Sequence, residues 1–251
     1  LPAFRRDVAG DWSGDRGAAV SERKKPIVAI DGPAGAGKST VARRVADRLG
    51  YVLVDTGSLY RAIALAAVRR SIVFDDDSGV GDLAEALARS GAVRLESAGT
   101  VARVVLEGED ISGFIRTPEI SQGASKVSAV PRVRAALLEM QRAAGRAGGV
   151  VLEGRDIGSV VFPEAEVKIF LTASVDERAR RRHAELVRAG TPADIEAVRR
   201  EVIERDRRDS SRPIAPLIQA KDALVVDSST LGVDDVVDNI VALVKRAENA
   251  P

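Results

Sequence analysis

Short aliphatic runs alternate with helical patterns along most of the chain. The runs have almost no polar interruption, and between them apolar residues recur at helical spacing. Near-continuous apolar strands separated by helices are typical of a parallel sheet that helices cover on both faces. The sequence therefore predicts a doubly wound α/β fold with a five-stranded parallel sheet. The predicted strands are residues 26–30, 51–55, 150–153, 167–171 and 223–227.

The segment between the second and third of these strands is too long for a single crossover. It contains a helical pattern at 80–91, and then the runs AVRLES and VARVVLE, which alternate like the strands of a hairpin around the turn AGT. We therefore predict an inserted small antiparallel subdomain at residues 71–116. The core of the predicted domain, 26–245, is then formed by residues 26–70 and 117–245.

Helix start signals mark the second half of the chain. Pro118 and Pro131 each open a helical pattern, and Pro in the first turn of a helix removes only an N–H that has no partner there. Ser174 opens another with the capping-box spacing S-x-x-E. A further helix is predicted to begin at Thr191-Pro192 and to run toward residue 211.

Composition excludes several classes of function. The 38 Lys and Arg nearly balance the 37 Asp and Glu, so no overall field draws the chain to nucleic acid or anionic lipid. The absence of Cys and the single His exclude thiol nucleophiles and ordinary zinc sites. The longest hydrophobic run has seven residues, far below the roughly 20 that span a bilayer. We expect a cytoplasmic protein that binds neither membranes nor nucleic acid, with residues 1–25 as a flexible tail.

The stretch DGPAGAGKST, residues 31–40, gives the strongest chemical signal. It satisfies GxxxxGK[ST] between an apolar strand and a helical pattern. Backbone N–H groups of such a loop point at phosphate oxygens, while Lys38 can reach the β- and γ-phosphates and the Ser39 hydroxyl can bind Mg²⁺. The sequence therefore predicts a site for a nucleoside triphosphate with its Mg²⁺. The predicted residues are Gly32, Pro33, Ala34, Gly35, Ala36, Gly37, Lys38, Ser39 and Thr40.

Two carboxylates compete for the metal beside this loop. Glu153 ends the third predicted strand and Asp55 ends the second. In P-loop folds an acidic residue on a neighbouring strand often faces the metal. Either carboxylate could instead cap the turn that follows its strand, and the sequence alone does not choose between them.

Arginines gather on two predicted helix faces and in one loop. The first face carries Arg178, Arg181 and Arg182, and the second carries Arg205, Arg208, Asp209 and Arg212. Taken alone, the first set fits a solvated, salt-bridged helix exterior, whereas the surplus of cations on the second favours binding of an anion. Arg155 and Asp156 lie in a loop at the carboxyl end of a strand, where open α/β sheets bind ligands.

Six motifs together resemble the bacterial cytidylate kinase family. They are GPAGAGKST (32–40), DTGSLYR (55–61), LEGEDISGFIRT (106–117), VLEGRDIGSVVFPEAEVKIFLTAS (151–174), ERDRRDSSR (204–212) and LVVDSS (224–229). They occur in that family's order and spacing over residues 26–245, and the resemblance includes the inserted subdomain. EGRDIGSVVFP is highly specific, whereas the P-loop alone is shared by a vast superfamily.

The resemblance implies phosphoryl transfer from MgATP to CMP or dCMP by a monomer, with 71–116 binding the monophosphate and about 176–190 forming a lid. Its implied catalytic residues are Lys38, Arg155, Arg178, Arg182 and Arg208. Its implied CMP-binding residues are Thr56, Arg61, Ser125, Arg134, Arg155, Asp156, Arg205, Asp209 and Arg212. Among these, Arg61 and Arg155 would bind the acceptor phosphate. Ser125, Arg134 and Asp156 would read cytosine, and Arg205 and Asp209 would hold the ribose.

Two positions depart from some members of the family. Glu153 stands where some have Asp, so its longer side chain favours contact with the metal through a water, with Ser39 as the direct ligand. Thr56 stands where some have Ser, which preserves the hydroxyl.

The implied base readers also suit cytosine chemically. Its edge offers one amino donor and two acceptors, so a carboxylate opposite the amino group, with Arg or Ser opposite the acceptors, complements it. Uracil reverses two of these three groups. We therefore expect a strong preference for cytosine over uracil and over purine monophosphates.

Two other readings of the P-loop remain open from the sequence. One is a kinase of the same fold for another acceptor, such as UMP, AMP or a small hydroxy acid. The other is a nucleotide-controlled binding module, although the chain has no NKxD motif of a guanine-specific switch. The inserted subdomain and the EGRD loop favour the cytidylate kinase interpretation.

Overall fold

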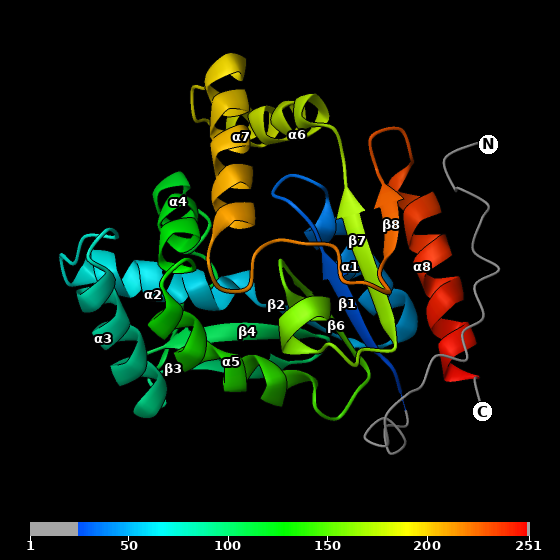
Figure 1. Cartoon of the computed structure of the whole chain (residues 1–251), viewed down its shortest axis with the longest axis horizontal. Coiled ribbons are helices and arrows are strands. Elements are labelled where there is room, and N and C mark those ends of the chain that lie inside the picture. The colour runs from blue at the N-terminus through cyan, green and yellow to red at the C-terminus, as the bar shows by residue number, and fades with distance from the viewer. Residues whose placement is uncertain (1–24, 250–251) are drawn as a thin grey trace.

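The computed structural model describes residues 25–249 and has the predicted α/β architecture (Figure 1). The predicted tail lies outside the described residues except for Lys25. Five parallel strands form the centre of one sheet in the order β2-β6-β1-β7-β8, close to the predicted ranges. They are β1 (Ile27–Asp31), β2 (Val52–Asp55), β6 (Val150–Gly154), β7 (Val167–Thr172) and β8 (Leu224–Asp227).

The predicted hairpin is present, but it extends the central sheet instead of forming a sheet of its own. β3 (Val93–Ala98) and β4 (Val101–Leu106) pair antiparallel, and the short β5 (Glu109–Asp110) pairs with β4. β4 also pairs in parallel with β2, so the sheet has eight strands and not five. Val104 and Leu106 are buried in the same hydrophobic cluster as helices of the core, and this burial explains why the hairpin joins the sheet.

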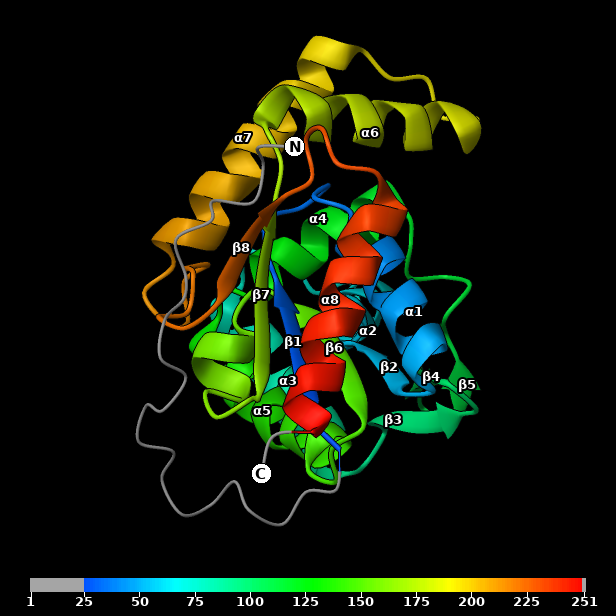
Figure 2. The ribbon, with the colours of Figure 1, turned by 90° about the vertical axis from the view of Figure 1, so that its right-hand side faces the viewer.

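Helices cover both faces of the sheet (Figure 2). α1 (Lys38–Leu49) and α8 (Val233–Glu248) lie on one face, while α5 (Pro131–Gly145) and the π-helical turn η1 (Ile157–Val161) lie on the other. Side chains of a strand alternate between the two faces of the sheet, so successive residues of β1 pack alternately into the hydrophobic clusters on these faces. The near-continuous apolar character of the strand follows from this double burial.

Three helices join the hairpin and α5 around a third hydrophobic cluster. They are α2 (Gly57–Arg69), α3 (Asp77–Arg89) and α4 (Pro118–Val127). Pro118 begins α4 and Pro131 begins α5, as predicted. The cluster therefore ties the insertion to the helices that carry several of the predicted acceptor residues.

α6 (Val175–Arg188) and α7 (Ile195–Ser211) lie above the carboxyl end of β7 (Figure 1). Ser174 caps α6 as predicted, since its Oγ accepts the Glu177 N–H at 3.2 Å. The predicted start of α7 at Thr191-Pro192 is wrong. The Asp194 carboxylate accepts the Ala197 N–H at 2.9 Å, and this side-chain cap begins the helix three residues later. Between residues 25 and 249, none of the helices has the length and apolar character that crossing a bilayer requires.

Candidate active site

The P-loop connects β1 to α1 and is shaped by its glycines. Gly32 has φ +148°, and a Cβ at this position would lie 1.9 Å from the Leu171 carbonyl oxygen, so only Gly fits. Lys38 is buried, and its Nζ donates to the Pro33 carbonyl at 2.7 Å across the loop. The loop residues therefore take the closely packed form that a phosphate cradle needs.

Ser39 and the two competing carboxylates lie together beside this loop. Ser39 Oγ donates to Glu153 Oε2 at 2.8 Å. Asp55 lies opposite Glu153 in the β2–β6 register, but its Oδ2 accepts from Arg61 at 3.0 Å. Burial raises the pKa of Glu153, and the Asp55 carboxylate adds to the rise. Two adjacent carboxylates and a hydroxyl are a donor set that suits a hard divalent cation, and Glu153 is the carboxylate nearer to Ser39.

We call Lys38, Arg155 and Arg205 the cation cluster, because the charge of Arg155 acts on both of the other residues. Burial lowers the pKa of Lys38 well below its usual range, and Arg155 lowers it further. Burial and Arg155 likewise lower the pKa of Arg205 to about 10. Among the described residues, Arg205 Nε is buried without a hydrogen-bond partner. Positive charges gathered in this way are stabilised when an anion binds between them.

Arg134, Asp156, Arg212 and Tyr60 form a second group, which we call the base cluster. The Asp156 carboxylate accepts from Arg134 on one oxygen and from Arg212 on the other, the latter at 3.4 Å. The Arg134 guanidinium lies 5.4 Å from the centre of the Tyr60 ring, and Gln141 donates to the Tyr60 hydroxyl at 3.3 Å. All four members of the cluster are buried, so Asp156 is held as a paired carboxylate in a polar pocket.

Asp209 connects the cation cluster to Ser125 of α4. It accepts from Arg155 Nε at 2.9 Å on one oxygen and from Ser125 Oγ at 3.4 Å on the other. Ser125 in turn accepts from Arg208 at 2.9 Å. Burial alone would raise the pKa of Asp209, but the charges of Arg155 and Arg205 hold it below its usual range. One chain of hydrogen bonds thus connects three predicted CMP-binding residues, Arg155, Asp209 and Ser125. It ends at Arg208, which was predicted for the phosphate path.

Of the three arginines on the predicted face of α6, Arg178 departs from the solvated helix exterior that their spacing suggests. Arg178 is buried, pairs with both carboxylate oxygens of Asp206 at 2.9 and 2.6 Å, and donates to the Ala34 carbonyl of the P-loop at 3.3 Å. Arg181 donates to Ser228 Oγ at 3.0 Å. Arg181 and Arg182 keep the predicted salt-bridged pattern, with Glu177 at 2.8 Å and Glu185 at 3.3 Å. At Arg178, contact with the P-loop and with α7 replaces solvent.

Thr56, like Arg61, is a predicted acceptor residue that bonds to neither cluster. Its hydroxyl donates to the Glu153 carbonyl at 2.8 Å and is buried. It therefore fastens the start of α2 to the end of β6. Arg61, five residues later, remains beside Asp55 at the carboxyl end of β2.

Three residues of the site were missed by sequence reasoning. Asp31 accepts the N–H groups of Ile157 and Gly158 at 2.8 and 2.7 Å, and its burial raises its pKa to about 6. Tyr60 lies under Arg134, and Asp206 clamps Arg178. Asp31 and Tyr60 occur inside quoted motifs, directly before Gly32 and Arg61, so their neighbours were the available signal.

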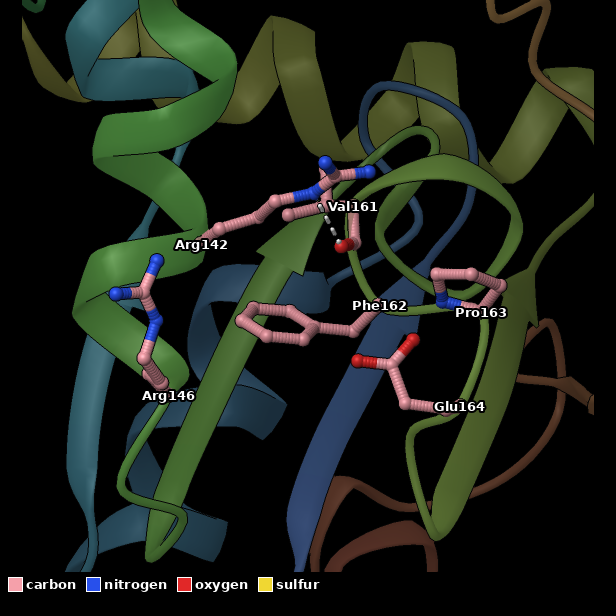
Figure 3. Close-up of a pocket in the computed structure, with 6 residues that line it drawn as sticks. All are labelled: Arg142, Arg146, Val161, Phe162, Pro163 and Glu164. Carbon is pink, nitrogen blue, oxygen red and sulfur yellow. Dashed lines mark hydrogen bonds between the residues drawn. The ribbon is translucent and has the colours of Figure 1, made fainter. Parts of the chain in front are cut away.

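Two cavities flank this region. One of about 130 Å³ is lined by Ser39, Asp55 and Glu153 together with the hairpin strand β4. Another of about 330 Å³ lies between α5 and the segment after η1, with Arg142 and Arg146 on one side and Phe162 to Glu164 on the other (Figure 3). None of the predicted site residues lines the second cavity.

Comparison with known proteins agrees with the motifs. A family model described as cytidylate kinase matches residues 28–246. The cytidylate kinase of Geobacter sp. (strain M21) is 50% identical over 220 residues, which cover 88% of this chain and 93% of that protein. The cytidylate kinase of Shewanella loihica is 46% identical over 224 residues, covering 89% and 96% of the two chains. That of Shouchella clausii is 48% identical over 219 residues, covering 87% and 96%.

Proposed function

The chain belongs to the cytidylate kinase family, and from this premise we propose which of its residues carry the ATP-dependent phosphorylation of CMP. In this reaction a phosphate oxygen of CMP bonds to the γ-phosphorus of ATP while the bond to the β,γ-bridging oxygen breaks, which gives ADP and CDP. The proposed acceptors are CMP and dCMP. The proposed form of the enzyme is a monomer.

One observation carries the assignment of the two substrates. Arg155 of the EGRD loop lies close enough to Lys38 of the P-loop to lower the pKa of the lysine further than burial does. Arg155 also donates to Asp209 at 2.9 Å and directly precedes Asp156 of the base cluster. A donor-phosphate site and an acceptor site therefore adjoin. Phosphoryl transfer needs this arrangement, because the protein mainly has to bring two anions together and neutralise the charge on the moving group.

The donor side consists of the P-loop, with Lys38 at the β- and γ-phosphates. On the acceptor side, Arg61 and Arg155 hold the CMP phosphate, while Arg205 and Asp209 hold the ribose. Arg178, Arg182 and Arg208 serve the phosphate path from α6 and α7. Arg178 is held beside the P-loop by its ion pair with Asp206 and its hydrogen bond to the Ala34 carbonyl.

Two members of the base cluster, Asp156 and Arg134, read cytosine together with Ser125. Asp156 accepts from the amino group, and Arg134 and Ser125 donate to N3 and O2. Arg212 supports the same carboxylate from the other side at 3.4 Å. Thr56 is proposed to act through the position of the Glu153 backbone, since its hydroxyl is already bonded there.

Mg²⁺ is the proposed metal, held by Ser39 directly and by Glu153 through a water. When bound, it would neutralise part of the charge on the ATP phosphates. Asp55 is the weaker candidate, because Arg61 already pairs with it.

Replacing Glu153 with Gln is expected to raise the Mg²⁺ concentration that gives half-maximal velocity by about tenfold, since a lost outer-sphere carboxylate typically weakens metal binding by 10- to 100-fold. A Mg²⁺ titration at fixed ATP measures it. Glu139→Gln, an exposed residue of α5 paired with Arg146, is the matched control and should leave the requirement unchanged. An unchanged requirement in Glu153→Gln would move the metal assignment to Asp55.

The proposed function is tested by measuring ADP formation from MgATP with CMP, dCMP, UMP, AMP or no acceptor, together with the matching diphosphate. Rapid turnover with CMP and dCMP alone is the expected result. Comparable turnover with UMP or AMP would assign another acceptor to the same fold. ADP formation that ignores the acceptor would contradict transfer and favour a nucleotide-controlled binding module.

A further inference from the structure

Asp31 is the last residue of β1 and directly precedes the P-loop, yet its side chain faces the acceptor side of the site. Its two carboxylate oxygens accept from the Ile157 and Gly158 N–H groups at 2.8 and 2.7 Å. These donors lie about half the chain away in the sequence. The contact therefore joins the strand that starts the donor site to the loop that carries the acceptor residues.

The two donors are the residues that immediately follow Asp156. They open η1, and the Asp156 carbonyl accepts from Val160 and Val161 at 2.9 and 3.1 Å. Asp31 thus holds the N–H groups that follow Asp156, and the helical turn holds the Asp156 carbonyl. A carboxylate that accepts two backbone N–H groups fixes both the position and the direction of the segment between them.

The segment packs against Lys168 and Asp31. A Cβ on Gly158 would lie 3.2 Å from Lys168 Cδ and 3.5 Å from Asp31 Oδ2. Asp31 itself is 5% exposed. Water therefore has little access to replace the carboxylate if it is lost, and the two N–H groups would be left without acceptors.

We propose that Asp31 is a positioning residue for base recognition, which holds Asp156 at the point where it meets Arg134, Arg212 and the cytosine edge. The inference rests on the proposed role of Asp156. It gives Asp31 an effect on the choice of acceptor, although the residue ends the strand that leads into the P-loop.

Asp31→Asn is the first test, because the amide keeps the shape but can accept only one of the two N–H groups. We expect the KM for CMP to rise about tenfold and the CMP:UMP ratio of kcat/KM to fall about tenfold, as follows from one unsatisfied buried donor. The KM for MgATP and kcat should stay within about threefold. Asp227→Asn is the matched control, since Asp227 also ends a parallel strand and caps Ser229 at 2.8 Å, away from the base cluster.

Gly158→Ala tests the same contact from the loop side and leaves β1 and the P-loop unchanged. The CMP:UMP ratio should fall in this variant too, by less than in Asp31→Asn. It decides the question if Asp31→Asn does not fold, because an unchanged ratio in Gly158→Ala would then overturn the proposal. An unchanged ratio in a folded Asp31→Asn, or a MgATP KM that rises as much as the CMP KM, would overturn it as well.

The wild-type enzyme separates this proposal from the proposed function. If the wild type does not phosphorylate CMP in preference to UMP, the proposed function fails before any variant is compared. If the wild type shows the preference and Asp31→Asn retains it, the role of Asp31 alone is wrong. A purely structural role would lower the melting temperature of Asp31→Asn without moving the CMP:UMP ratio.

Discussion

Replacing Lys38 with Ala is expected to lower kcat for CMP phosphorylation by about 10³-fold, which corresponds to roughly 4 kcal/mol of transition-state stabilisation. Lys38 is the one lysine of the P-loop, and its ammonium would stabilise the negative charge on the phosphoryl group during transfer. No hydrophobic core residue is changed, so the variant should remain folded. Initial rates at saturating MgATP and CMP measure the loss.

Thermal melting adds a second readout to the same variant. Without ligand, burial and Arg155 already disfavour the charged form of Lys38, so its removal should leave the melting temperature unchanged or raise it. The stabilisation that MgATP adds to the wild type should be reduced, because it scales with affinity for the folded state. Lys245→Ala, near the end of α8, is the matched control and should retain both kcat and the MgATP shift. A kcat within tenfold of wild type in Lys38→Ala would contradict the donor site.

The fold class and the P-loop could be predicted because their signals are local. Near-continuous apolar strands require burial on both faces, and the glycines of residues 32–37 permit backbone conformations that other residues resist. The start of α7 was missed for a local reason as well. Pro192 and Asp194 both fit a helix start. The helix begins after Asp194, because the carboxylate of Asp194 accepts the Ala197 N–H.

Partners between distant segments could not be predicted from spacing. The i, i+3 and i+4 pattern of Arg178, Arg181 and Arg182 fits both a solvated face and a packed one, and only the positions of Asp206 and the P-loop decide between them. Likewise, the hairpin sequence predicts β3 and β4, but the pairing of β4 with β2 depends on tertiary packing. The contact between Asp31 and Ile157 joins residues more than 120 positions apart, so no local sequence pattern predicts it.

The choice between Glu153 and Asp55 illustrates the same limit. Both end parallel strands, and the register places them opposite each other beside the P-loop. Their neighbours distinguish them, since Ser39 bonds to Glu153 and Arg61 bonds to Asp55. Sequence reasoning could find the pair of candidates, whereas the side-chain contacts rank them.

Replacing Asp156 with Asn should change acceptor choice more than any other single substitution in the site. The amide is nearly the same size, and it can donate to the O4 of uracil where the carboxylate could only oppose it. We expect kcat/KM for CMP to fall by about tenfold to over a hundredfold while that for UMP falls less or rises, from the ~1–3 kcal/mol that one mismatched buried hydrogen bond costs. Acceptor titrations at saturating MgATP measure both ratios.

Asp156→Ala separates base reading from charge balance. It leaves Arg134 and Arg212 buried without their shared carboxylate, so we expect lower stability as well as a smaller CMP:UMP ratio, with the KM for MgATP nearly unchanged. Asp75→Asn, an exposed residue paired with Lys126, is the control for loss of a surface carboxylate. If both Asp156 variants keep the wild-type CMP:UMP ratio, Asp156 does not read the base. The paired arginines would then make it a structural counter-ion, and cytosine selection would have to come from Ser125 and Arg134 alone.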